Sequence, residues 1–174
     1  MQLSKELILE AKKNNKAVAF KGIFNNLPTW SEFIGHIDHA SKQKSINPRE
    51  SDGSRMKDFG DIHFWERLLM SVEDAESFFP QTKEIIDEIG QIFEGVRPGS
   101  HTVVCFSTNE PGTGEHIDVP DVIFWQCIGS VTWNILDGSG DTFTLYPGDA
   151  IYIPGGILHR VDSNTPRASI SFGL

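Results

Sequence analysis

Residues 148–159 read GDAIYIPGGILH, and this stretch decides the fold. Gly148 can turn the chain into a strand on which Ile151 and Ile153 pack toward one face, because alternate strand residues point the same way. A proline and two glycines then interrupt this strand and redirect the chain into a second strand that contains His159. Two short strands joined by a tight break are typical of an all-β domain.

A second pattern, His116-Ile-Asp118, lies upstream of this stretch. Residues i and i+2 of a strand share a face, so both side chains could reach one ion. Together with His159 they give two imidazoles and one carboxylate, the set that binds non-haem Fe(II) and leaves coordination positions open. Manganese, nickel or zinc could use the same ligands. H-x-D alone occurs often by chance, and His159 could be a hydrogen-bonded core histidine, but the two patterns together favour a metal site.

The rest of the chain indicates a barrel preceded by helices. From residue 101 to 174, seven short segments of period two are separated by Gly, Pro and Asp, as in a sandwich or barrel. Residues 1–100 are predicted to be a helical front with an opening strand at 17–24. We therefore expect one mostly β domain over residues 1–174, a jelly-roll barrel with helices on one outer face.

Several local features of the front half can be predicted. Helices are expected at 4–14, after the capping box that Thr29 and Glu32 begin, at 61–70 and at 82–94. Residues 41–60 are polar and positively charged on balance, and are predicted to be a long loop. This loop is either a solvated connector or a flap that closes over the barrel mouth. His36 and His39 are expected on the surface of a helix.

Composition narrows the class of protein. The 174 residues suit one domain, and the net charge of −9 makes non-specific nucleic-acid binding a poor expectation. No apolar run reaches the roughly 18 residues of a membrane span, and no signal peptide is visible. The only cysteines, Cys105 and Cys127, lie in apolar segments and make no disulfide framework, so a cytoplasmic protein is expected. Its oligomeric state is left open.

The stretch at 148–159 resembles a known family motif. It is similar to the second metal-binding motif of the cupins, G-x5-P-x-G-x2-H, at every fixed position: Gly148, Pro154, Gly156 and His159. The first cupin motif, G-x5-H-x-H-x3-E-x6-G, is kept in part. Its first histidine and last glycine match, while Asp118 replaces the second histidine and Val122 replaces the glutamate.

Within the cupins, the chain is similar to the JmjC-type oxygenases. Residues 116–133 resemble their H-x-D segment and the following Q-x-x-G-x-x-x-W strands, and residues 145–159 resemble their second metal-binding segment. The early segment 17–24 resembles the strand that opens such domains. The resemblance implies a cupin (double-stranded β-helix) barrel, Fe(II) on His116, Asp118 and His159, and 2-oxoglutarate as a small-molecule cosubstrate.

One departure concerns the cosubstrate. Many members of the family pair the far carboxylate of 2-oxoglutarate with a lysine at the position of Val131. Arg167, in the R-x-S pattern of the last strand, is a candidate substitute, with help from Ser169 or Thr113. Alternation would turn Arg167 and Ser169 into the barrel, although Arg167 could also be a solvated residue at the strand start.

Three functions follow from these features. The first is an Fe(II)- and 2-oxoglutarate-dependent dioxygenase that hydroxylates or demethylates a substrate, which the resemblance implies is often a protein or peptide. The second is a metal cupin that does not use 2-oxoglutarate, either another dioxygenase or an isomerase, and Val131 favours it. The third is a binding module that lost its chemistry, against which the intact ligand set argues.

Overall fold

The computed structural model describes residues 3–43, 46–49, 69–106 and 112–174. Most of the loop or flap predicted at 41–60, and most of the helix predicted at 61–70, therefore lie outside the described residues. The helices are α1 (Lys5–Lys13), α2 (Trp30–Lys42), α4 (Ala75–Phe78) and α5 (Thr82–Ile92). The strands are β1 (Val18–Phe20), β2 (Ile46–Arg49), β3 (Leu69–Glu73), β4 (Gly99–Cys105), β5 (Thr113–Ile117), β6 (Val122–Ile128), β7 (Val131–Ile135), β8 (Thr142–Leu145), β9 (Ala150–Ile153), β10 (Leu158–Ser163) and β11 (Arg167–Gly173).

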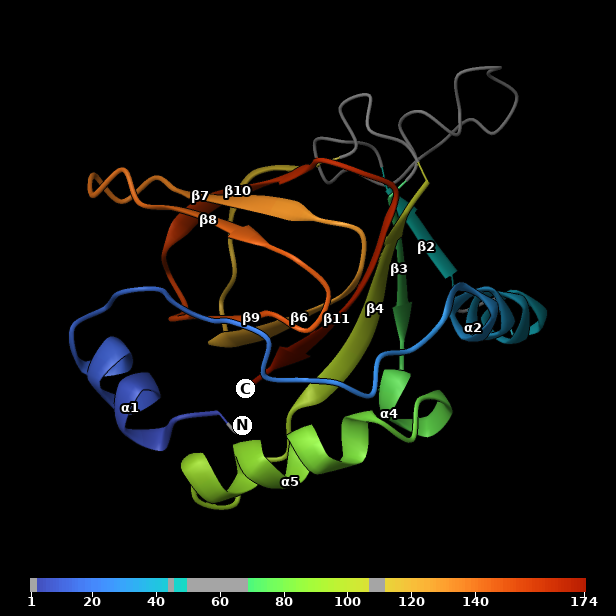
Figure 1. Cartoon of the computed structure of the whole chain (residues 1–174), viewed down its shortest axis with the longest axis horizontal. Coiled ribbons are helices and arrows are strands. Elements are labelled where there is room, and N and C mark those ends of the chain that lie inside the picture. Colours follow the sequence, from blue (N-terminus) through green and yellow to red (C-terminus); the bar gives the residue numbers. More distant parts are fainter. Residues whose placement is uncertain (1–2, 44–45, 50–68, 107–111) are drawn as a thin grey trace.

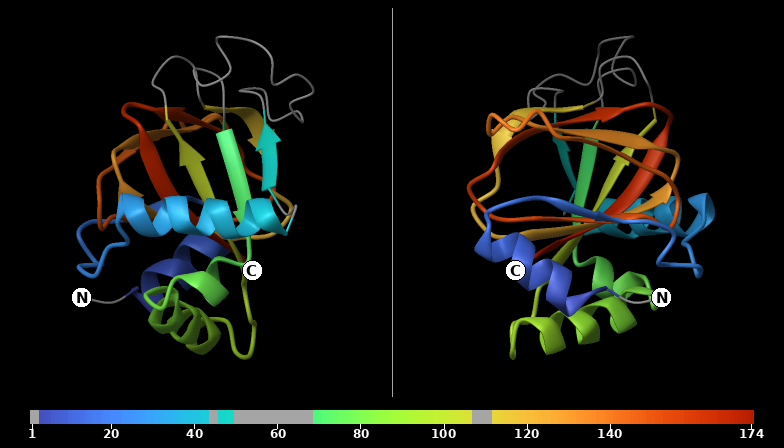
Figure 2. Two further views of the ribbon diagram at one scale, coloured as in Figure 1. Left: turned by 90° about the vertical axis from the view of Figure 1, so that its right-hand side faces the viewer. Right: turned by 60° about the vertical axis from the view of Figure 1, so that its left-hand side comes forward.

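Two antiparallel sheets face each other and form the barrel (Figure 1). The larger has seven strands in the order β1-β9-β6-β11-β4-β3-β2, and the smaller has four in the order β5-β10-β7-β8. Neighbours in each sheet are mostly distant in sequence, as expected where the chain winds between two sheets. The helices α1, α4 and α5 lie on the side of the larger sheet that faces away from the smaller one, and α2 lies beside β2 and β3 (Figures 1 and 2).

Alternation along the strands divides the core in two. One hydrophobic cluster fills the barrel between the sheets, and it includes Phe124, Trp133 and Ile151. The other lies between the larger sheet and the helices, and it joins Trp125 and Tyr152 to the apolar faces of α1, α2 and α5. Every second residue of the central strands thus points into the barrel, which is where the polar residues of a site would also have to lie.

The helices predicted at 4–14, after Thr29 and at 82–94 are present as α1, α2 and α5. The capping box is present, since the Thr29 side chain accepts from the amide of Glu32 and the Glu32 carboxylate accepts from the amide of Thr29. Helix α5 buries Ile85, Ile89 and Ile92 on one face, as the spacing predicts. None of the helices within the described ranges has both the length and the apolar composition needed to cross a bilayer.

Two predictions about the front half are wrong. Residues 46–49 form β2, within the predicted loop, because an edge strand needs only one partner and tolerates Pro48. Leu69 and Met70 begin β3 and do not end a helix. The larger sheet thus takes three strands, β1 to β3, from the first hundred residues.

The prediction for His36 is also wrong, because its imidazole is only 3% exposed and stacks on Phe78 with ring centroids 5.0 Å apart. The other histidine of α2, His39, is exposed as predicted. Both cysteines are buried and form no disulfide.

Candidate metal centre

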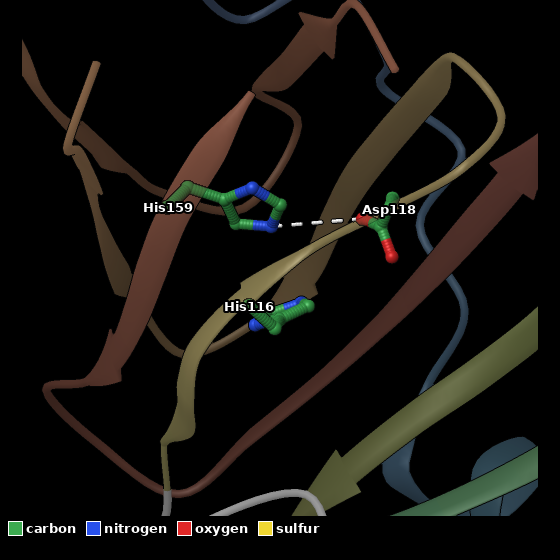
Figure 3. A group of neighbouring side chains, drawn as sticks. All are labelled: His116, Asp118 and His159. Atoms are coloured by element: carbon green, nitrogen blue, oxygen red, sulfur yellow. Dashed lines mark ion pairs between the residues drawn. The ribbon is translucent and has the colours of Figure 1, made fainter. Parts of the chain in front are cut away.

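The side chains of His116, Asp118 and His159 point toward one another (Figure 3). One nitrogen or carboxylate oxygen from each of the three lies within 4.8 Å of the others. The Nε2 atom of His159 lies 3.6 Å from an Asp118 carboxylate oxygen, and the two imidazole centroids are 4.3 Å apart. No other group of three such side chains in the described part of the chain comes this close together.

Strand pairing brings the three residues together. His116 in β5 lies directly opposite His159 in β10, so both imidazoles leave the smaller sheet on its inner face. Asp118 follows β5, and its carbonyl accepts a hydrogen bond from the amide of Gly156 at 2.9 Å. Gly156 has φ +86° at the break that the sequence predicts before His159. The Pro-Gly-Gly turn before His159 therefore contacts the backbone of Asp118 directly.

Both imidazoles are oriented by backbone carbonyls. The Nδ1 atom of His116 lies 2.7 Å from the carbonyl oxygen of Gly114, and the Nδ1 atom of His159 lies 2.9 Å from that of Ile157. A carbonyl only accepts, so Nδ1 must donate in each ring, which leaves the Nε2 lone pairs for another partner. The hydrogen-bonded Nδ1 of a metal-ligating histidine fixes its tautomer in this way.

The three residues fit a divalent metal ion. The Nε2 atom of His159 is buried and has no hydrogen-bond partner among the described residues. Burial lowers the pKa of His159, which favours the neutral imidazole that a metal requires. An unpartnered buried acceptor beside a second imidazole and a carboxylate is the donor set of a facial triad. The binding of a metal by these three residues stays a prediction.

A cavity of about 150 Å³ adjoins the triad. This volume is below the roughly 300 to 1,000 Å³ of pockets that hold drug-sized ligands. Thr113 and Trp133 line this cavity, and the hydroxyl of Thr113 and the indole N–H of Trp133 are buried without a hydrogen-bond partner among the described residues. The wall also contains His116, Asp118, Arg167 and Ser171.

Arg167 places a buried positive charge in the cavity wall. Its side chain is 1% exposed, and it donates to the hydroxyls of Ser163 at 2.7 Å and Ser169 at 3.4 Å. No carboxylate among the described residues pairs with it. Burial lowers the pKa of Arg167 to about 10, so the guanidinium keeps its charge at neutral pH. An unpaired buried cation is unfavourable unless an anion joins it, so this wall is suited to an acidic ligand.

Arg167 is hydrogen-bonded to a residue that directly opposes Val131. Ser163, which accepts from the Nε atom of Arg167, is the direct cross-strand partner of Val131. Directly opposed strand residues have Cβ atoms about 4.5 to 5.5 Å apart. The last strand can therefore supply the cation that Val131 cannot, from a neighbouring point of the barrel wall.

The other predicted cosubstrate residues differ in their surroundings. Thr113 lines the cavity, as described above. Ser169 is fully buried and does not line it; its hydroxyl donates to Gln126 at 2.8 Å and accepts from Arg167. Ser169 is thus placed to orient the guanidinium and not to touch a ligand. Ala168, Ile170 and Phe172 lie in the outer cluster, as the alternation of the last strand predicts.

Sequence reasoning overlooked three residues around the cavity. Trp133 stacks on His159, with ring centroids 5.0 Å apart, and the Q-x-x-G-x-x-x-W pattern does not indicate this contact. Ser163 could have been found by counting alternate residues from His159 along the same strand. His101 lines the cavity from β4, and no local spacing reveals that, because the larger sheet reaches the site through long-range pairing.

Solved structures with the same fold include YcfD, a ribosomal oxygenase from Escherichia coli. Its complex with cobalt and 2-oxoglutarate matches with a TM-score of 0.74 at 19% identity, and its complex with cobalt and succinic acid with 0.74 at 20%. Both matches cover 98% of this chain and 51% of that chain, so this chain spans about half the length of YcfD. SnoN, a non-haem α-ketoglutarate-dependent epimerase from nogalamycin biosynthesis, matches with a TM-score of 0.55 at 12% identity, over 97% of this chain and 81% of that chain.

No family model matches the chain, and neither does any curated protein. At the identities found, the likeness to solved structures is one of fold. Together with the two facing antiparallel sheets and the helices on one outer face, it confirms the predicted architecture. The chain is a mostly β, cupin-type jelly-roll barrel with N-terminal helices.

Proposed function

We propose that this chain is a JmjC-like oxygenase that uses Fe(II), 2-oxoglutarate and O₂ to hydroxylate or demethylate a substrate. One observation supports this most strongly. The convergent triad and a buried arginine, which no carboxylate of the described residues pairs with, lie at the same small cavity. A short dicarboxylate with a keto acid at one end requires a metal ion for the keto acid and a positively charged side chain for the far carboxylate.

Each residue has a definable role in this proposal. His116, Asp118 and His159 hold the metal, and their backbone-fixed imidazoles present Nε2 to it. Arg167 pairs with the far carboxylate of 2-oxoglutarate. Ser163 and Ser169 hold the guanidinium in place. When bound, Fe(II) supplies the oxidising chemistry.

The hydroxyl of Thr113 and the indole N–H of Trp133 are donors that a bound carboxylate would satisfy. These two groups lie buried in the cavity wall, so the pocket also excludes water from the bound cosubstrate. In the overall reaction, one oxygen atom enters the substrate C–H bond. The other enters succinate as 2-oxoglutarate loses CO₂.

The solved structures support the cosubstrate more than the substrate. YcfD was crystallised with cobalt and 2-oxoglutarate, and SnoN is described as α-ketoglutarate-dependent. YcfD is also described as a ribosomal oxygenase, which favours a protein or peptide substrate for this chain. The cavity is too small for much beyond the cosubstrate, so the substrate would bind at its mouth. The buried reduced thiols fit a reducing compartment such as the cytoplasm.

A second candidate is a metal cupin that does not use 2-oxoglutarate. It is favoured by Val131, which is fully buried in the barrel core and offers no charge at the position of the usual lysine. This candidate leaves the burial of Arg167 without an explanation, and we rank it second for that reason.

Succinate release separates the two candidates. Purified protein is incubated with Fe(II), 2-oxoglutarate and O₂, and succinate is quantified with and without each component. The proposal predicts slow release even without substrate, which stops when Fe(II) or O₂ is omitted and in His116→Ala. Metal binding without any succinate release, in the presence of candidate peptides, would favour the second candidate.

A further inference from the structure

We propose that Asp121 is a positioning residue, which holds the segment of Asp118 against the turn that precedes His159 and so keeps the metal ligands in register. The inference rests on the proposed metal site and deepens it. The hydrogen bonds of the Asp121 carboxylate reach none of the three ligands, and no sequence motif marks this residue. Its role follows from the groups that its carboxylate joins.

The carboxylate of Asp121 accepts three hydrogen bonds from three separate parts of the chain. One oxygen accepts from the amide of Gly155 at 2.8 Å. The other accepts from the Tyr152 hydroxyl at 2.8 Å and from the Lys12 ammonium at 2.6 Å. Asp121 therefore connects the segment after β5 to the end of β9, to the break before β10, and to helix α1.

Two of these segments contain the metal ligands. Asp121 lies three residues after Asp118, and Gly155 lies four residues before His159. A second hydrogen bond runs in parallel, from the amide of Gly156 to the carbonyl of Asp118 at 2.9 Å. The two segments are thus fastened at two adjacent points, and the distance between Asp118 and His159 depends on both.

The same two segments approach so closely that only glycine fits between them. A Cβ atom on Gly155 would lie 2.3 Å from the carbonyl oxygen of Val119 and 3.0 Å from the carbonyl carbon of Pro120. Since these are backbone atoms, a side chain at 155 would push the Asp118 segment away. The close approach is independent of the Asp121 hydrogen bonds, and it shows that the spacing of the two segments is tightly set.

Asp121 keeps its charge in this position. Burial acts to raise the pKa of Asp121, but the Gly155 amide, the Lys12 ammonium and the Tyr152 hydroxyl together outweigh burial and lower it. The carboxylate is therefore ionised at neutral pH, and it can bind all three donors at once. An ionised carboxylate can hold the two segments together throughout the neutral pH range.

The chain provides a matched control in Asp149. This buried carboxylate also accepts from two backbone amides, those of Gly22 and Tyr146, and from one lysine, Lys21. It joins the chain after β1 to the turn between β8 and β9. None of these contacts involves the segments of Asp118 or His159, so loss of Asp149 tests the general effect of removing such a carboxylate.

The test measures Co(II) binding and stability in the wild type, Asp121→Ala and Asp149→Ala. Metal-supporting residues outside the ligand set typically change metal affinity by 10- to 100-fold. We expect Asp121→Ala to raise the Co(II) Kd by about tenfold or more and to alter the visible absorption spectrum of the bound Co(II). Asp149→Ala should lower the melting temperature of the metal-free protein about as much as Asp121→Ala does, but it should leave the Co(II) Kd and the absorption spectrum unchanged.

Two further variants keep the test decisive if Asp121→Ala does not fold. Asp121→Asn keeps an acceptor for Gly155, and it should give a Kd between those of the wild type and the alanine variant. Gly155→Ala should weaken Co(II) binding through the clash with Val119. A Kd within twofold of the wild type in Asp121→Ala and Gly155→Ala would overturn the inference, as would equal weakening in Asp149→Ala.

The failure of this inference differs from the failure of the proposed function. If the wild type binds no Co(II), or if His159→Ala binds it as well as the wild type does, the metal site itself is wrong and both proposals fall. If the wild type binds Co(II) at the triad but Asp121→Ala is indistinguishable from it, only the positioning role is rejected. Neither readout depends on 2-oxoglutarate or on turnover.

Discussion

Replacing Arg167 with methionine should leave the folded protein about as stable while removing the anchor for 2-oxoglutarate. The lowering of the Arg167 pKa from 12.5 to about 10 corresponds to roughly 3 kcal/mol of unfavourable free energy for the buried charge. The hydrogen bonds to Ser163 and Ser169 and the contact with the Phe124 ring offset it, at roughly 1 kcal/mol each. Methionine removes both sides of this balance and has a similar length.

Two quantities should therefore respond differently. The unfolding free energy of the metal-free protein, measured in urea, should change by less than about 1 kcal/mol. Truncating one partner of a buried charge pair weakens binding by about 2 to 5 kcal/mol, so the Kd for 2-oxoglutarate should rise by roughly 30-fold or more. Calorimetry with Mn(II) under anaerobic conditions measures that Kd without turnover.

The control is Arg160→Met, because Arg160 lies on the exposed side of β10 and pairs with Asp162 at 3.1 Å. This variant should change neither quantity. The reasoning is refuted if Arg167→Met binds 2-oxoglutarate within threefold of the wild type. It is equally refuted if Arg167→Met loses several kcal/mol of stability, since Arg167 would then be a structural residue.

Three other predictions concern stability. Burial lowers the pKa of His36 from 6.5, so the stability that neutral His36 provides is complete above pH 6.5 and is lost as the pH falls through the pKa of the folded state. The unfolding free energy should therefore fall less steeply on acidification in His36→Phe than in the wild type. Equal slopes in the two proteins would reject this prediction. Gly129→Ala should lower the unfolding free energy, measured in urea, by more than about 3 kcal/mol, because the new Cβ would lie 2.2 Å from the carbonyl oxygen of Pro166 at φ +72°. Gly138→Ala is the control: Gly138 has φ +98° and open space around it, so this variant should lose only about 1 kcal/mol. Similar losses in the two variants would contradict the packing around Gly129. Mn(II) at 100 times its Kd should raise the unfolding free energy by about 2.7 kcal/mol, chelation should reverse the gain, and an alanine variant of any triad ligand should show no such gain.

The geometry of the candidate site was predictable from the sequence where it depends on local spacing. The H-x-D pattern and the break before His159 fix which residues face each other once the strands pair. Alternation along the last strand was enough to turn Arg167 inward and Phe172 outward. In each case the period of two, read over a few residues, determines the direction of the side chain.

Features that depend on long-range pairing were not predictable. Strand β2 has no clear alternation, and it is a strand because β3 pairs with it at the sheet edge. His36 is buried because Phe78 and Phe79, forty residues away, pack over its face of α2. The contacts of Asp121 join segments that are up to 109 residues apart, and no short motif records them.

A crystal structure with Mn(II) and 2-oxoglutarate, grown without oxygen, tests the central claim most directly. The account predicts one ion bound by the Nε2 atoms of His116 and His159 and by the Asp118 carboxylate, with the keto acid on the ion and the far carboxylate on the Arg167 guanidinium. Density for the ion at another place, or for 2-oxoglutarate outside the cavity that Arg167 lines, would contradict it.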